Sequence, residues 1–404
     1  MTDTPDRGPD PSGALDAPAD VRSLTREGNV LAARAPGGDP ASPPATEGPT
    51  LAFVGHHDVV PPDDSQVRGD GDVDAEAGGG ATDGQGGGET DGGQGGSEYV
   101  VETRDGRLYG RGTADMKGSL AALACAFRDA PLPAGGPQLV FASFVGEEVG
   151  GEGCRAAIED GFAPDWAVVG EGSTGYSGAG VTDVAVAHKG RRASTLVAHG
   201  RAAHASEPER GENAVYRATD AVSTVRDLDV PRATVLGHDL AGSVVVTGIE
   251  GGEAWNVVPE RCTVTVDERT VPGDRADLAS AVGEAVDWGV DQDLPPMACG
   301  DERFADAALV AARRAHAHSA DPLADESNGD AVSGQAGDAT PEHVVKPHAT
   351  DAGWLADRAG TDCVVCGAAE PGEAHTAGES VSLAVLDRCY RIYRLVAGTF
   401  TGED

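Results

Sequence analysis

The chain has 404 residues, of which 39% are hydrophobic, and this length and composition suit two folded domains with packed cores. Its formal net charge is −37, and only three of its 30 basic residues are lysines. Such a surface repels nucleic acids and anionic membranes, so we expect neither as a partner.

The sequence carries no recognisable targeting or membrane segment. No apolar run is long enough to span a bilayer, and the first residues, MTDTPDRGPDPSG, lack the positive start and apolar stretch of a secretory signal. We therefore expect a cytoplasmic protein. The acidic, lysine-poor composition resembles that of proteins from halophilic archaea, in which salt screens self-repulsion.

The cysteines do not predict a disulfide framework, because there are seven of them, an odd number, in a long chain. Cys363 and Cys366 form a C-x-x-C pair within the apolar run TDCVVCG. Buried thiols and a metal or redox site are both compatible with this pair. The apolar surroundings and the absence of a second pair nearby favour buried thiols.

Residues 1–180 show the pattern of an α/β domain. Apolar strands are expected at 50–57, 138–145 and 165–171, and a helix is expected from Met116 to about Ala130. This alternation predicts a mostly parallel sheet flanked by helices. Residues 63–97 are rich in Gly and Asp and have few apolar side chains, so we expect a disordered acidic insertion there.

Residues 181–292 show the period-two alternation of antiparallel strands and predict an inserted α+β domain. Its strands are expected at 181–190, 192–200, 241–252 and 261–270, and its helices at 211–228 and 274–287. Residues 293–404 return to helix–strand alternation and are expected to complete the first domain. Within them, residues 318–341 resemble a second flexible insertion.

Polar residues follow the apolar strands at successive points of the first domain. They are His56, His57, Asp58, Asp115, Glu147, Glu148, Glu171 and, later in the chain, His375. Ligand sites of open α/β sheets gather at the carboxyl ends of the strands, so we expect these side chains to meet at one rim. Two imidazoles with several carboxylates suit a divalent metal such as zinc.

Each cluster by itself also has a simpler interpretation. The H-x-D pattern is compatible with a polar strand end, the Glu147–Glu148 pair with a solvated turn, and Asp115 with the cap of the next helix. Neighbouring residues of an extended chain point in opposite directions. One glutamate of the pair can therefore bind metal while the other faces a substrate water as general base.

Five motifs in chain order resemble those of the M20 metallopeptidase and amidohydrolase family, which includes acetylornithine deacetylase and succinyl-diaminopimelate desuccinylase. They are GHHDVVP, GRGTADMKGSLAA, VGEEVGGEG, VVGEGS and AHTAGES. In the inserted segment, HGRAAHASEPERGENAV and GGEAWNVVPERCTVTVDERTVPG resemble the lid and dimerisation domain of that family. The resemblance implies a zinc-peptidase-like sheet domain, a ferredoxin-like inserted domain and a homodimer formed through the inserted domain.

The resemblance also implies two zinc ions, for which cobalt can substitute. His56, Asp115 and Glu171 would hold one ion. Asp115, Glu148 and His375 would hold the other, so that Asp115 bridges the two.

The other implied roles concern catalysis and substrate binding. Glu147 would activate the attacking water as general base, and Asp58 would orient His56. His204 of the partner subunit would stabilise the tetrahedral oxyanion. Further candidates for contacts with substrate carboxylates are Arg192, Asn256 and Arg269.

The implied activity is the removal of an N-acyl group from an amino acid in amino-acid biosynthesis, with N-succinyl-diaminopimelate or N-acetylornithine as the substrate type. An M20 dipeptidase, carboxypeptidase or aminoacylase is the alternative. A non-catalytic binding protein on the same scaffold is a third possibility, against which the presence of Glu147 and all five ligands counts.

Overall fold

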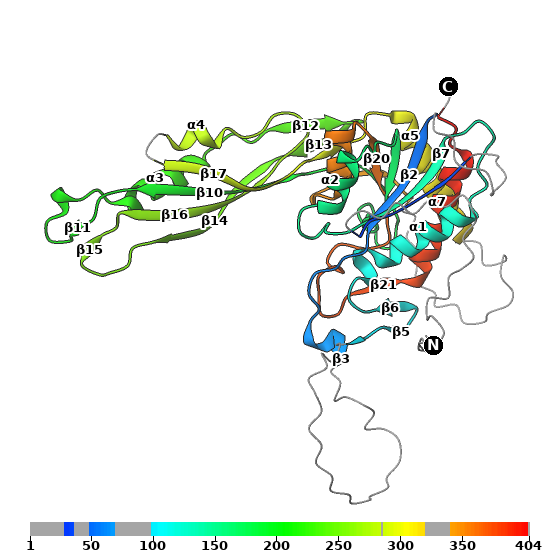
Figure 1. Cartoon of the computed structure of the whole chain (residues 1–404), viewed down its shortest axis with the longest axis horizontal. Coiled ribbons are helices and arrows are strands. Elements are labelled where there is room, and N and C mark those ends of the chain that lie inside the picture. The colour runs from blue at the N-terminus through cyan, green and yellow to red at the C-terminus, as the bar shows by residue number, and fades with distance from the viewer. Residues whose placement is uncertain (1–27, 36–47, 69–97, 284–285, 320–339, 403–404) are drawn as a thin grey trace, which may run out of the picture.

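The computed structural model describes residues 28–35, 48–68, 98–283, 286–319 and 340–402. These residues form a rounded body and an arm that projects from one side of it (Figure 1). The arm consists of the described residues between 191 and 294, and the remaining described residues form the body.

The body is built on a mixed sheet with the strand order β1-β7-β2-β8-β20-β9-β18, in which β19 also pairs with β9. The neighbours from β7 to β20 run parallel, whereas the edge strand β1 and the strands β20, β9 and β18 pair antiparallel. The strands are β1 (Val30–Arg34), β2 (Thr50–His56), β7 (Gln138–Phe144), β8 (Trp166–Val169), β9 (Val184–His188), β18 (Met297–Ala298), β19 (His343–Lys346) and β20 (Asp362–Val365).

Helices cover both faces of this sheet. On one face, α1 (Gly118–Asp129), α5 (Glu302–Ser319) and α7 (Leu383–Thr399) enclose a core that contains Phe53 and Val364. The opposite face packs against α2 (Glu152–Glu159), α6 (Asp351–Trp354) and the π-helical turn η4 (Leu355–Ala359), with Val54 and Val365 in its core. Because successive residues of a strand point to opposite faces, an uninterrupted apolar strand supplies both cores.

Small sheets complete the body below α1. Strands β5 (Glu102–Arg104), β6 (Arg107–Tyr109) and β21 (Ser380–Ser382) form one of them, and β3 (Val67–Arg68) pairs with β4 (Glu98–Tyr99) after the 3₁₀ turn η1 (Asp64–Gln66). None of the helices in the described ranges combines the length and the apolar character that a bilayer span requires.

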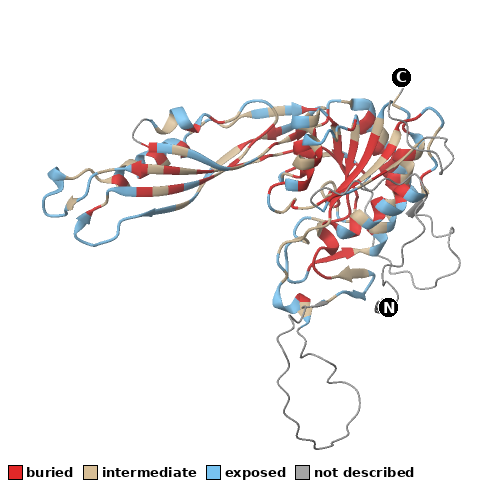
Figure 2. Cartoon of the chain, viewed as in Figure 1, coloured by how far each residue is buried: buried red, intermediate tan, exposed pale blue. Residues whose placement is uncertain are grey.

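The arm is an α+β domain with a ferredoxin-like topology. Its strands lie in the order β14-β16-β10-β17, and along the chain they alternate with helices as β10-α3-β14-β16-α4-β17. The elements are β10 (Arg191–His199), α3 (Ala214–Arg226), β14 (Ser243–Gly251), β16 (Arg261–Arg269), α4 (Leu278–Val282) and β17 (Val286–Leu294). One face of the sheet packs against the helices through Leu196, Val264 and Val266, and in Figure 2 buried residues alternate with less buried ones along the arm strands.

Shorter elements lie at the two ends of the arm. The pair β11 (Ala203–His204) and β15 (Val257–Val258) lies at the end far from the body, next to the 3₁₀ turn η3 (Pro208–Arg210) (Figure 1). The hairpin of β12 (Arg232–Val235) and β13 (His238–Ala241) lies near the body.

The structure differs from the sequence-based boundaries in two places. The strand expected within 181–190 is β9, which belongs to the body sheet, so the arm begins after it and not at residue 181. The helix expected over 274–287 is only α4, which ends before Gly283 at φ 75°, and β17 follows. The alternation of Val286, Trp288 and Val290 has the period of a strand, and this strand pairs with β10.

The two expected insertions lie largely outside the described residues. Of the segment 63–97, residues 63–68 form η1 and β3, and residues 69–97 are outside the described ranges. Of the segment 318–341, residues up to Ser319 extend α5, and residues 320–339 are outside the described ranges.

Candidate metal centre

Parallel strands at the middle of the body sheet deliver the candidate ligands to one edge. His56 is the last residue of β2, the Glu147–Glu148 pair follows β7, and Glu171 follows β8. His375 lies in the loop after β20. Because these strands are parallel neighbours, their carboxyl ends meet at one rim.

Asp115 lies between the two histidines and contacts both of them. Its Oδ1 is 3.1 Å from His56 Nε2, and its Oδ2 is 2.9 Å from His375 Nε2. On the outer sides, Glu171 Oε1 is 3.2 Å from His56 Nε2, and Glu148 Oε1 is 3.1 Å from His375 Nε2. The arrangement therefore has two imidazole centres that share one carboxylate.

The backbone of Asp115 is held by a buried ion pair. Glu379 Oε1 accepts hydrogen bonds from the backbone N–H groups of Ala114 and Asp115, at 3.0 and 3.1 Å. Its second oxygen accepts from Arg111 Nη1 at 2.7 Å, and both side chains are almost fully buried. This pair connects the GRGTAD segment to the AHTAGES segment and so brings Asp115 close to His375.

The side chain of Met116, the residue after Asp115, packs beneath the sheet edge, and two glycines leave room for it. A Cβ at Gly55 would lie 2.5 Å from Met116 Cε, and one at Gly170 would lie 2.8 Å from the same atom. Met116 is fully buried in consequence. Side chains at these two glycines would displace Met116 and with it Asp115.

Asp58 supports the site in two ways. His56 Nδ1 donates to the backbone carbonyl of Asp58 at 3.1 Å, and the Asp58 carboxylate lies farther away at 3.4 Å. The two carboxylate oxygens accept from the N–H groups of Glu147 and Glu148, at 3.3 and 3.2 Å. Asp58 therefore fixes the orientation of His56 and also the loop that carries both glutamates.

The carboxylates of the centre favour positively charged groups, and this is seen in the pKa values of the two histidines. Burial alone would lower the pKa of His56, but hydrogen bonds to Asp115, Asp58 and Glu171 raise it well above its usual range. The hydrogen bond to Asp115 raises the pKa of His375 to about 9 despite some burial. Burial opposes ionisation of Asp115, but both histidines hold its pKa well below the usual range.

Glu147 is a half-buried carboxylate that lies among the other acidic groups of the centre. Burial raises its pKa well above the usual range, and the nearby carboxylates of Glu171 and Asp351 add to this effect. Burial also raises the pKa of Glu148, but less strongly. Both glutamates are half-buried and line the same cavity.

The donor set fits a pair of divalent cations. Single ligand atoms of His56, Glu147 and Glu171 lie within 4.8 Å of one another, and so do those of His56, Asp115 and Glu148. Ligands that share one zinc ion at about 2.0–2.2 Å lie about 3–3.5 Å from each other. The separations of 2.9–3.2 Å between imidazole nitrogens and carboxylate oxygens approach this spacing.

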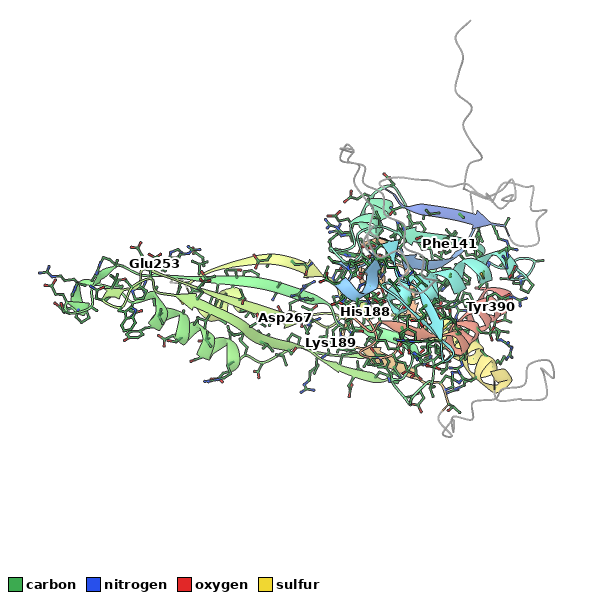
Figure 3. The ribbon with its side chains drawn as sticks, turned by 90° about the horizontal axis from the view of Figure 1, so that it is seen from below. Phe141, His188, Lys189, Glu253, Asp267 and Tyr390 are labelled. Atoms are coloured by element: carbon green, nitrogen blue, oxygen red, sulfur yellow. The ribbon has the colours of Figure 1, made fainter. Side chains whose placement is uncertain are left out.

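The cluster forms the floor of a cavity of about 570 Å³ between the body and the arm. Arg191 and Arg269 line it from the arm, and the Asp267 carboxylate binds both guanidinium groups, at 2.7 and 2.8 Å. From the body, Lys346 and His348 line it. Figure 3 labels Asp267 on the arm and His188 and Lys189 where the arm joins the body.

Arg192 does not line this cavity, contrary to its predicted role as a substrate contact. Its guanidinium is buried on the helix-facing side of the arm, donates from Nε to Glu268 at 2.6 Å and from Nη2 to the carbonyl of Ala276 at 2.7 Å. Neighbouring residues of a strand face opposite sides, so Arg191 takes the cavity side instead.

We expect the substitution Arg192→Met to lower the free energy of unfolding by about 3–5 kcal/mol, because it leaves the buried Glu268 carboxylate without its cation. Arg191→Met removes a partly exposed pair and should cost about 1 kcal/mol or less. Urea unfolding at fixed salt measures both. A double variant with Glu268→Leu should recover stability, and equal losses for the two single variants would contradict the assignment.

His204 and Asn256 lie together at the far end of the arm. Asn256 Nδ2 is 3.5 Å from His204 Nε2, and His204 Nδ1 is 2.6 Å from Ser206 Oγ. Neither residue lines the cavity of its own chain. His57 points away from the centre, and its Nδ1 is 2.8 Å from Ser143 Oγ.

The cysteine pair is buried and divided between the two cores. Cys363 packs in the core beside α2 and α6, whereas Cys366 packs in the core beside α1 and α7. Burial raises the pKa of both thiols well above the usual range. The two sulfurs thus face opposite sides of the sheet.

Sequence reasoning missed several residues that line the cavity or support its floor. They are Arg111, Tyr176, Arg191, Lys346, His348, Thr350 and Glu379. The run KPHAT directly follows the apolar strand HVV, so the strand-end signal that identified the other residues was present there as well.

Comparison with known proteins gives results that agree with this architecture. A family profile for the M20 peptidase dimerisation domain matches residues 186–287. Acetylornithine deacetylase from Klebsiella pneumoniae (strain 342) is 31% identical over 242 residues. The aligned region covers 58% of this chain and 54% of the deacetylase, so the chain spans about half the length of this relative.

Solved structures share the fold over most of the chain. The M20 family metallo-carboxypeptidase Sso-CP2 from Sulfolobus solfataricus has a TM-score of 0.61 at 14% identity, covering 95% of this chain and 90% of that one. The YXEP protein from Bacillus subtilis, a dinuclear metal-binding peptidase of the M20 family, has a TM-score of 0.55 at 14% identity, covering 93% and 87%. The chain therefore resembles M20 proteins in three respects, namely the matched dimerisation domain, the deacetylase relative and the shared fold.

Proposed function

We propose that this protein is a metal-dependent hydrolase of amide bonds that removes an N-acyl group from an amino acid. The observation that carries the proposal is the convergence of His56 and His375 on the two oxygens of Asp115 at the floor of a cavity. The deacetylase relative supports N-acetylornithine as the substrate type, and N-succinyl-diaminopimelate is the other type that the sequence motifs imply.

The residues present would hold two divalent ions, which we take to be zinc, with cobalt as a substitute. His56, Asp115 and Glu171 would bind one ion, and Asp115, Glu148 and His375 would bind the other. Binding replaces the protons that the two histidines otherwise retain, because cations neutralise the same carboxylates. Bound ions polarise an amide carbonyl and acidify water.

The chain's own residues would manage the proton. Glu147 accepts a proton from the attacking water as the water oxygen bonds to the amide carbon, and then transfers it to the departing nitrogen as the C–N bond breaks. The products are a carboxylate and an amine. The enclosed position of Glu147 supports this role, since a carboxylate shielded from bulk water retains the proton between the two steps.

A second copy of the chain would complete the site. The proposed oxyanion contact, His204, lies at the far end of the arm with Asn256, and neither lines the cavity of its own chain (Figure 1). Both residues would therefore act on the cavity of a partner subunit in a homodimer. The match to a peptidase dimerisation domain supports this arrangement. Arg269, which does line the cavity, remains the proposed contact for a substrate carboxylate.

A peptidase of the same family is the second candidate. The shared fold with a metallo-carboxypeptidase favours it, because a peptide bond is also an amide and the cavity's arginines could bind a terminal carboxylate. The choice between the two depends on which groups flank the cleaved bond.

The test is a hydrolysis assay with added zinc or cobalt at high salt, using N-acetylornithine, N-succinyl-diaminopimelate and simple dipeptides. We expect one acylated amino acid to be cleaved, the activity to disappear after chelation, and about two ions per chain to restore it. Cleavage of dipeptides alone would favour the peptidase. Protein that binds no divalent metal would overturn the proposal.

A further inference from the structure

Lys346 is a buried cation that faces the cavity. It is the last residue of β19 and is only 5% exposed. Its side chain lines the same cavity as the metal cluster, on the body side. Within the described residues, no carboxylate forms an ion pair with its ammonium group, and no side chain forms a hydrogen bond with it.

None of the described groups around Lys346 serves as a dedicated counter-ion for its ammonium group. His188, its partner across the pairing of β9 and β19, is neutral, because burial lowers its pKa to about 3. Thr350 donates its hydroxyl proton to His188 Nε2 at 3.1 Å, and His188 Nδ1 donates to the Lys189 carbonyl. The neighbouring carboxylates Glu171, Asp115 and Glu147 belong to the proposed metal centre, where cations and the transferred proton would neutralise them.

Burying an ammonium group without a counter-ion costs folding free energy. The presence of Lys346 at this position is explained if a ligand brings the opposite charge. The choice of side chain supports this reading, because only three of the chain's 30 basic residues are lysines. Burial lowers the pKa of Lys346, while the metal-centre carboxylates oppose this effect. A carboxylate brought by a substrate would hold the ammonium in its charged form.

The arm side of the cavity carries a second cationic group. Arg191 and Arg269 share the single carboxylate of Asp267, so this trio has a net positive charge. A substrate with one carboxylate satisfies only one of the two cationic groups. A substrate with two carboxylates can offer one to the arm arginines and the other to Lys346.

We propose that Lys346 determines specificity by binding a second substrate carboxylate, so that the enzyme prefers N-acyl amino acids with a carboxylate on each side of the amide. This inference rests on the proposed function. It selects the N-succinyl type of substrate over the N-acetyl type. The arginines of the arm bind the other carboxylate.

The test compares three matched substrates: N-succinyl-ornithine, N-acetyl-ornithine, which lacks the acyl carboxylate, and N-succinyl-ornithine amide, which lacks the α-carboxylate. The zinc-loaded wild type should have the highest kcat/KM for the first. Lys346→Met should reduce the preference over N-acetyl-ornithine by about 10- to 100-fold, mainly through KM. Lys346→Arg should restore part of it.

Lys189→Met is the matched control, because Lys189 is a neighbouring lysine that does not line the cavity. It should leave the preference as in the wild type. A wild type without preference for the doubly charged substrate, or a Lys346→Met variant that weakens all three substrates equally, overturns the proposal. Thermal unfolding of both variants separates a fold defect from a binding defect.

Product binding separates failure of this inference from failure of the proposed function. Calorimetric titration of the zinc-loaded protein with succinate and with butyrate, a monocarboxylate of the same length, needs no turnover. If none of the substrates is cleaved, the proposed function fails. Succinate binding that exceeds butyrate binding in the wild type but not in Lys346→Met then still supports the carboxylate site, and equal binding of the two acids overturns it.

Discussion

Replacing Glu147 by glutamine is expected to lower kcat by about 10²–10⁴-fold, the range that a positioned general base contributes. Glutamine has the shape of glutamate but cannot accept the proton from water. Glu147 is enclosed by the cavity floor, and the carboxylates of Glu171 and Asp351 already raise its pKa. Steady-state kinetics of the zinc-loaded variant measure the loss.

The metal content of the Glu147→Gln variant distinguishes a general base from a metal ligand as the cause of the lower kcat. The Glu147 carboxylate is within ligand distance of His56 and Glu171, so geometry alone leaves it free to bind metal. If Glu147→Gln retains two ions per chain and loses turnover, the residue acts on the proton. If the variant loses one ion, Glu147 is a ligand, and the assignment of Glu147 and Glu148 must be revised.

Glu152→Gln is the matched control for this experiment. Glu152 begins α2, only five residues further along the chain, and its exposed side chain does not line the cavity. The same change of charge at this position should leave kcat within about twofold, since surface substitutions have small effects. Full activity of Glu147→Gln would exclude the proposed base.

Replacing Asp115 by asparagine is expected to remove most metal binding. Among the described residues, Asp115 is the one carboxylate that contacts both imidazoles, at 3.1 and 2.9 Å, so its loss affects both proposed ions at once. Loss of a hydrogen bond that supports a metal ligand lowers metal affinity by about 10- to 100-fold. Loss of the bridging ligand itself should lower the zinc affinity by more than this. Equilibrium dialysis against zinc with elemental analysis measures the stoichiometry and the affinity.

Asp105→Asn controls for charge and for the fold. Asp105 is exposed in the turn between β5 and β6 at φ 50°, a conformation that asparagine tolerates. This variant should bind two ions as the wild type does. If Asp115→Asn also binds two ions with unchanged affinity, the bridging role proposed for Asp115 is excluded.

The strands of the body were predictable because their signal is local. Apolar runs such as 50–57 and 138–145 contain enough β-branched and aromatic residues to indicate buried strands, and the structure has β2 and β7 there. The boundary of the arm was not predictable in the same way. β9 has the composition of a strand in either sheet, and only its pairing with β19 and β20 assigns it to the body.

The centre itself illustrates the same division. His56, Asp115, Glu148, Glu171 and His375 follow strand ends or open a helix, so the rule that parallel strands end at one rim was sufficient to group them. The choice of Arg192 as a substrate contact was wrong. Successive side chains of a strand point to opposite faces, and the sequence does not show which face of this strand lies toward the cavity.

The sequence by itself indicated the resemblance to the M20 family, the order of the elements and the residues that end the central strands, because these depend on composition and on spacings of a few residues. Only the tertiary structure decided which groups act together across long separations. The pairing of Arg111 with Glu379, the sharing of Asp267 by two arginines and the burial of Lys346 against the cavity all join distant segments. Such contacts arise from packing, and the local pattern of a chain carries no record of them.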